Sequence, residues 1–103
     1  MRTQTTDMAA AARRVLLEKP PSEADEKRLL RQQEIMRRRI GARIKKLRTA
    51  AHLSLRALET KTNITSSYLS ELERGIRSPT SDLLVRLSYA FPGVTPASFL
   101  EED

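Results

Sequence analysis

The sequence predicts an all-α fold, in which a helical N-terminal extension precedes one small domain of short helices. Apolar residues recur at spacings of three and four, as they do along one face of a helix. Serine or threonine stands before most of these apolar runs, where it can cap the first turn of a helix. The strict alternation of apolar and polar residues that is typical of a half-buried strand is missing. A chain of 103 residues suits one domain with a limited core.

The composition argues against an enzyme or a metal protein. The chain has no cysteine, which excludes disulfides and thiolate metal sites and fits a reducing compartment. Its one histidine, His52, has no second candidate ligand beside it, so we expect a structural role. The serines at positions 66, 67 and 70 have no adjacent base that could activate them as nucleophiles. We therefore expect no catalytic residue, no metal and no cofactor.

Basic residues gather in the second half of the chain. The formal net charge is +6, and residues 37–103 hold twelve basic and seven acidic residues. Residues 37–48 alone contain seven basic residues and no acidic one. Such a cluster attracts polyanions, either DNA or an anionic lipid surface, and a solvated helix face is the open alternative. No apolar run approaches the ~20 residues that span a bilayer, and the polar N-terminus does not resemble a signal peptide.

Two helical segments are expected in the N-terminal half. The first covers residues 6–18 and stops at the two prolines that follow. Its apolar side holds Met8, Ala12, Val15 and Leu16. Ser22 is a typical N-cap, because three acidic residues follow it in the first turn. The apolar face of the second segment consists of Leu29, Met36, Ile40, Ile44, Leu47 and Ala51.

The second segment has two possible forms. Residues 22–50 form one long helix if the helix continues through Gly41, at a cost of about 1 kcal/mol relative to alanine. Otherwise they form two helices with a bend near residues 37–41.

Capping residues divide the rest of the chain into four shorter helices. His52 tolerates a positive φ and is expected to end the preceding helix. The expected N-caps are Ser54, Thr65, Thr80 and Thr95. The expected stops are Asn63, Gly75, and Pro92 with Gly93. The apolar residues of the last two helices are Leu83, Leu84, Leu87, Phe91, Phe99 and Leu100.

Two of these short helices form a unit with the turn between them. Leu58 and Ile64 can pack against Leu69 and Leu72 and fix the angle between the two helices. This is the helix-turn-helix arrangement, whose first helix lies across the DNA backbone and whose second helix enters the major groove. The same leucines would form a core in a helical cluster that binds no DNA. The order of the surrounding residues must therefore distinguish a DNA-binding motif from such a cluster.

That order resembles a known family. In SSYLSELERGIRSPT, residues 66–80, a polar helix, an E-R-G turn and an S-P-T cap follow one another. The segment is similar to the Xre/Cro-type helix-turn-helix family of bacterial and phage transcriptional regulators, and the likeness extends over residues 40–100. The resemblance implies a five-helix repressor-like DNA-binding domain over residues 37–103. Residues 1–36 would then be a helical extension for dimerisation or partner binding.

The resemblance also assigns roles to individual residues. The expected base contacts are Ser66, Ser67, Ser70 and Glu71, whose hydroxyls and carboxylate can pair with base edges. The expected phosphate contacts are Arg43, Arg56, Thr65, Arg77 and Ser78. Arg48 and Glu73 occupy the positions of an ion pair, which we expect to orient the second helix more than it stabilises the fold.

Three positions depart from the family pattern. Glu59 stands where the family usually has a small residue that lets the two helices pack closely. It must bend outward, pair with a neighbour such as Lys61 or a more distant base, or widen the crossing of the helices. Asn63 replaces a frequent glycine, and Pro92 looks like an extra residue between the last two helices.

The sequence therefore predicts a sequence-specific DNA-binding transcriptional regulator in the cytoplasm, on the nucleoid. The specific expectation is a repressor that binds a palindromic operator as a homodimer, because two recognition helices about 34 Å apart match one turn of DNA. The dimer interface uses either the last helix, with Phe99 and Leu100, or the N-terminal helix. The N-terminal helix is favoured, because Leu29, Leu30 and Ile35 have no other obvious partner, and Met36 lies close to them.

Two other functions stay open. The chain could be an antitoxin-like or adaptor protein whose N-terminal helices bind a protein partner, with DNA binding reduced to autoregulation. A copurifying partner would favour that function. A membrane-surface protein would instead use the basic cluster at residues 37–48, and binding to anionic lipid without competition from DNA would favour it.

Overall fold

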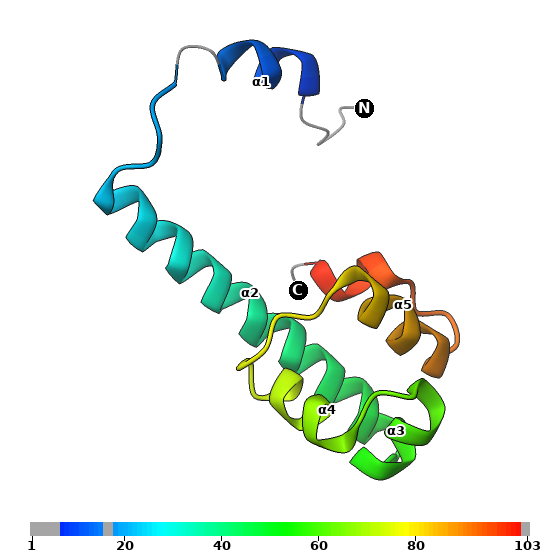
Figure 1. The fold of residues 1–103 in the computed structure, drawn as a ribbon. Helices are drawn as coiled ribbons and strands as arrows, with labels where there is room; N and C mark the ends of the chain where they lie inside the picture. The colour runs from blue at the N-terminus through cyan, green and yellow to red at the C-terminus, as the bar shows by residue number, and fades with distance from the viewer. Residues whose placement is uncertain (1–6, 16–17, 102–103) are drawn as a thin grey trace.

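A computed structural model describes residues 7–15 and 18–101, and within them every regular element is a helix (Figure 1). The order is α1 (Met8–Arg14), α2 (Glu23–Ala50), α3 (Leu55–Thr62), α4 (Ser66–Glu73), α5 (Ser81–Ala90) and the 3-10 helix η1 (Pro96–Leu100). The all-α prediction is confirmed. The second half of α2, together with α3, α4, α5 and η1, supplies the five helical elements of the expected domain.

α1 is shorter than expected and stands apart from the other helices (Figure 1). The side chain of Asp7 caps it by accepting the N–H groups of Ala9 (3.1 Å) and Ala10 (3.2 Å). The helix ends at Arg14, whereas the sequence predicted residues 6–18, of which positions 6, 16 and 17 lie outside the described residues. No residue of α1 is buried, so its expected apolar side contributes nothing to the core.

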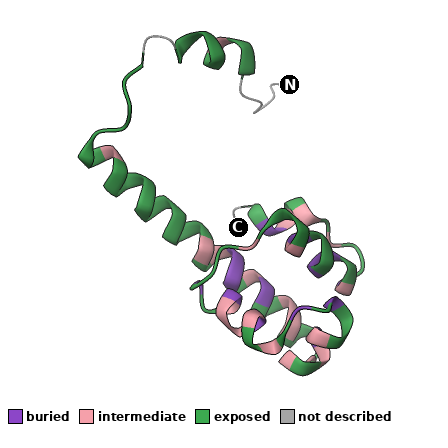
Figure 2. Cartoon of the chain, in the orientation of Figure 1, coloured by how far each residue is buried: buried purple, intermediate pink, exposed green. Residues whose placement is uncertain are grey.

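α2 is one continuous helix of 28 residues, and the alternative of a bend near residues 37–41 is wrong. Ser22 caps it in a reciprocal box, in which the Ser22 hydroxyl accepts the Asp25 N–H (3.1 Å) and the Asp25 carboxylate accepts the Ser22 N–H (3.0 Å). Its first buried residue is Ile40, so the residues before Met36 project from the domain (Figure 2). We call residues 23–36 the arm. None of the described helices is both long and apolar enough to cross a membrane.

α2, α3 and α4 end where the sequence predicted. His52 has φ 58°, and the Leu53 N–H donates to the Arg48 carbonyl (3.0 Å), which closes α2 with a Schellman-type turn. Asn63 has φ 61° and ends α3, and Gly75 has φ 75° and follows α4. The predicted serine and threonine N-caps of α3, α4, α5 and η1 each accept a backbone N–H.

The core lies between the second half of α2 and the four shorter elements. Its buried side chains are Ile40, Ile44, Leu58, Ile64, Leu69, Leu72, Leu84, Leu87, Phe91 and Phe99. Phe99 is fully buried, so η1 closes the core from the C-terminal side, whereas its neighbour Leu100 stays exposed. By the usual scale of burial, each fully buried leucine or phenylalanine stabilises the fold by about 1.5–3 kcal/mol.

The surroundings of Gly41 explain why the interior of α2 contains a glycine. A Cβ atom at this position would lie 2.2 Å from the Leu72 carbonyl oxygen and 2.8 Å from that of Glu73. The backbones of α2 and α4 are therefore in direct contact at this point. The close packing offsets the poor helix propensity of glycine and sets the distance between α2 and the end of α4.

We expect Gly41→Ala to destabilise the fold by ~1–3 kcal/mol, although alanine is the better helix former. The new methyl group would overlap backbone oxygens that cannot move unless α4 shifts. Urea unfolding followed by circular dichroism measures the change. Ala42→Gly is the control: Ala42 is exposed on the same helix, so the preference for alanine should hold there. Equal or greater stability of Gly41→Ala would contradict the close contact.

Candidate nucleic-acid interface

The turn between α3 and α4 is fixed by buried groups. Leu58 and Ile64 are buried on either side of it and pack with the apolar face of α4, as predicted. Thr62 is also buried: its hydroxyl donates to the Leu58 carbonyl (2.8 Å) and accepts the Ile64 N–H (3.2 Å). The sequence analysis missed Thr62, because a threonine at a helix end has no distinctive pattern. With its polar groups satisfied, the turn holds α4 at a defined angle to α3.

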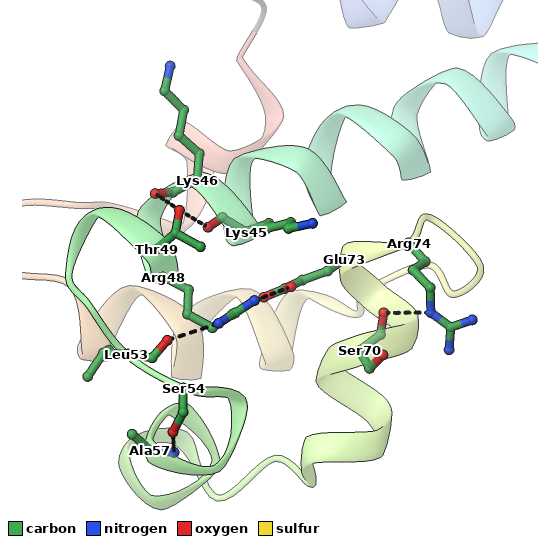
Figure 3. A network of polar contacts seen from close by, with 10 residues as sticks. All are labelled: Lys45, Lys46, Arg48, Thr49, Leu53, Ser54, Ala57, Ser70, Glu73 and Arg74. Carbon is green, nitrogen blue, oxygen red and sulfur yellow. Dashed lines mark hydrogen bonds and ion pairs between the residues drawn. The ribbon is translucent and has the colours of Figure 1, made fainter.

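α4 has one face in the core and one polar face toward solvent. Leu69 and Leu72 are fully or almost fully buried. Ser67 is exposed, and Ser70 and Glu71 are partly exposed. All four expected base contacts, Ser66 included, are therefore at least partly exposed, on a helix whose opposite side is anchored. Arg74 is exposed at the C-terminal end of α4, and its Nε donates to the Ser70 carbonyl (3.4 Å) (Figure 3). The sequence analysis assigned no role to Arg74.

Ser66, the fourth expected base contact, is engaged by Glu59. One oxygen of the Glu59 carboxylate accepts both the Ser66 N–H (3.0 Å) and the Ser66 hydroxyl (2.5 Å). Glu59, for which the sequence left several arrangements open, thus forms a cap on the first turn of α4, where a negative charge is favoured. The hydroxyl and backbone bonds from Ser66 hold the pKa of Glu59 below its ordinary value. A base contact by the Ser66 hydroxyl would have to compete with this bond.

Glu71 and Arg77 were assigned to different roles, but the structure joins them. Arg77 Nε donates to Glu71 Oε1 (2.6 Å), with side chains that are 52% and 34% exposed respectively. The Arg77 guanidinium also lies over the ring of Tyr68, 5.0 Å from its centroid. The arginine that follows α4 is therefore held against the helix by an ion pair and by a cation–π contact.

Arg48 and Glu73 form the ion pair that the resemblance implied. Arg48 Nε donates to one carboxylate oxygen of Glu73 (2.6 Å) and Nη2 to the other (3.0 Å), while Nη1 donates to the Leu53 carbonyl (2.9 Å) (Figure 3). Both side chains are largely buried, 14% and 6% exposed. The hydrogen bonds to Glu73 raise the pKa of Arg48, so the guanidinium stays charged. One side chain thus connects α2, the turn before α3 and the end of α4.

A family model described as helix-turn-helix matches residues 44–99, more than half of the chain. The chain belongs to the Xre/Cro-type helix-turn-helix family. α3 and α4 are therefore the first and second helices of the helix-turn-helix.

Sequence relatives and a solved structure both support this family membership. Two uncharacterized HTH-type transcriptional regulators of Mycobacterium tuberculosis, MT0491 of strain CDC 1551 / Oshkosh and Rv0474 of strain H37Rv, are each 39% identical over 50 residues. The matched segment is 48% of this chain and only 36% of the length of each regulator. The crystal structure of the clp gene regulator ClgR from Corynebacterium glutamicum is 34% identical, with a TM-score of 0.58 over 63% of this chain and 68% of that chain.

The five expected phosphate contacts are placed differently around this helix-turn-helix, and one of them, Arg77, is the arginine held by Glu71 and Tyr68. Arg56, Thr65 and Ser78 are exposed, at the start of α3, at the N-cap of α4 and after α4. Arg43 is placed differently: its Nη1 donates to the Ser98 carbonyl (3.1 Å) and its Nη2 to the Glu101 carbonyl (2.8 Å). Arg43 therefore ties α2 to the C-terminal segment, a role that the sequence did not predict.

Glu73→Ala should destabilise the helix-turn-helix by about 2–4 kcal/mol, because it leaves the Arg48 guanidinium largely buried without its counter-charge. Glu34→Ala is the matched control, since it removes the exposed pair of Glu34 with Arg38 (3.0 Å) and should cost under about 0.5 kcal/mol. Thermal unfolding of both variants makes the comparison. Losses of the same size would show that the Arg48–Glu73 pair contributes no more than a surface pair.

Proposed function

We propose that this chain is a sequence-specific DNA-binding transcriptional regulator and that α4 reads its operator. The observation that carries the proposal is the division of α4 into an anchored apolar face and an accessible polar face. A helix held in this way can enter the major groove without losing its orientation. Membership of the helix-turn-helix family supports the proposal, as do the names of the relatives, which are called transcriptional or gene regulators.

The charges on the chain fit a DNA surface. The net charge of +6 favours approach to a polyanion, and Arg56, Thr65 and Ser78 can bind phosphates on either side of the groove. Ser67 and Ser70 can donate to or accept from base edges in the groove. Repression at a palindromic operator is the specific form of regulation that we propose, with the protein on the nucleoid in the cytoplasm.

We also propose that the operator is bound by a homodimer that pairs through the arm. Leu29 is 47% exposed and Leu30 is 63% exposed, and Met36 is exposed as well. Leu29 and Met36 extend the face of α2 whose later residues, Ile40 and Ile44, are buried in the core. None of these three side chains belongs to the hydrophobic core or packs against it.

Charge complementarity favours a second copy as that partner. The arm begins with three acidic residues, Glu23, Asp25 and Glu26, and three arginines at positions 37–39 follow its end. Two arms that pair in antiparallel order would set the acidic start of each against the basic end of the other. Such charges select orientation more than they add affinity. The symmetric contact also has the two-fold axis that a palindromic operator requires.

Selection from a random duplex pool tests the DNA proposal. We expect the wild-type chain to enrich one sequence, with an affinity that falls steeply as salt increases. Arg56→Ala should weaken binding to every sequence and reduce the salt slope by about one. Lys27→Ala, on the arm, removes the same charge and should leave the slope unchanged. A purified chain that binds no duplex at low salt would remove the basis of the proposal.

Sedimentation velocity tests the dimer. Leu29→Glu should convert the homodimer to a monomer, whereas Arg31→Gln, which changes the net charge equally on the side of the arm away from Leu29 and Met36, should leave it intact. A wild-type chain that stays monomeric at concentrations that saturate the operator would contradict arm pairing. A monomer that copurifies in defined ratio with a different protein would favour the antitoxin-like or adaptor function instead.

A further inference from the structure

The guanidinium of Arg77 is held in place but stays accessible to a ligand. Its guanidinium is fixed on two sides, by Glu71 at Nε and by the Tyr68 ring below its plane. It is nevertheless 52% exposed, and it lies against the polar side of α4. An exposed arginine normally samples many rotamers, so a held one is already ordered before it meets a ligand.

The bond to Glu71 determines which N–H donors of Arg77 stay available to a ligand. Guanidinium has five N–H donors in one plane, and Nε uses its single N–H on Glu71. The terminal nitrogens Nη1 and Nη2 together form the edge that points away from the rest of the side chain. Two parallel donors on that edge match the O6 and N7 acceptors of guanine, which is the commonest specific arginine contact in the major groove.

We propose that Arg77 reads a guanine of the operator, and that Glu71 is a positioning residue which holds it. This inference rests on the proposed function, since it assumes that α4 lies in the major groove. It changes the roles expected from the sequence, in which Glu71 accepts from a cytosine and Arg77 binds a phosphate. The Tyr68 ring supports the flat side of the guanidinium, so the plane of the fork is set as well as its direction.

Electrostatics favours base reading by Arg77, with Glu71 as its positioning residue, over direct base reading by Glu71. A lone carboxylate that enters the groove meets the negative potential of the phosphates on both strands. Glu71 already has Arg77 as its counter-charge, and Glu71 Oε1 is occupied by Arg77 Nε. The pair can approach DNA with no net charge of its own and with the arginine donors in front. Direct reading of cytosine by Glu71 would leave only Oε2 for the base, with the Arg77 guanidinium held beside it.

The test compares base preferences of variants on the operator selected by the wild-type chain. Fluorescence anisotropy at fixed salt gives the affinity for each base pair at each position. We expect Arg77→Lys, which keeps the charge but loses the fork, to reduce the preference for one G·C pair by about five- to a hundredfold. Glu71→Ala should reduce the preference at the same pair, although it removes a negative charge near the DNA. Arg74→Lys is the matched control and should leave the profile unchanged.

Modified DNA shows which base of that pair the protein contacts. Replacement of its guanine by 7-deazaguanine removes the N7 acceptor, so wild-type affinity should fall there while the Arg77→Lys affinity changes little. If Glu71→Ala loses the preference but Arg77→Lys keeps it, Glu71 reads cytosine and the inference is overturned. It is also overturned if Arg77→Lys leaves the profile intact and Arg77→Ala weakens all sequences equally, because Arg77 is then a phosphate contact. A wild-type chain that selects no sequence overturns the proposed function together with this inference.

Discussion

The orientation of α4 depends on the bidentate contact between Arg48 and Glu73. Arg48 lies in the last turn of α2, Glu73 is the last residue of α4, and the third bond of Arg48 reaches the Leu53 carbonyl before α3. Removing two charges from water is costly, so the pair adds little net stability. The pair instead fixes geometry, because the planar guanidinium can make all its bonds in only one arrangement of α2, the turn before α3 and the end of α4. The contact of Gly41 with the same end of α4 limits the arrangement further.

The two ends of α4 are therefore held by different means. The C-terminal end is fixed to α2, while the N-terminal end is capped by Thr65 and by Glu59 from α3. Glu59 occupies a position that usually has a small residue, and its carboxylate turns to the positive end of α4 instead of separating the helices. The cap engages the hydroxyl of Ser66. The polar groups left for a ligand thus lie further along α4 and just beyond it, where Arg77 is held.

Much of the fold could be predicted because its signals are local. The caps at Ser54 and Thr65 and the left-handed residue at Asn63 depend on neighbours within about four residues. The continuity of α2 could not be decided, because glycine disfavours a helix locally and the contact of Gly41 with α4 is tertiary. The pairing of Glu59 with Ser66 and of Glu71 with Arg77 crosses turns whose geometry spacing does not fix. Arg48 and Glu73 could be paired only through the resemblance to a family.

The unbroken α2 links the proposed dimer contact to the position of α4. The arm ends at Met36, and α4 meets α2 five residues later at Gly41, with no turn or linker between them. Each residue of an α-helix adds about 1.5 Å and about 100° of rotation. A single insertion between these two points would therefore rotate α4 by about 100° relative to the arm. If the arms pair as proposed, the spacing of the two half-sites is set by a rigid helix, and not by the length of a flexible connection.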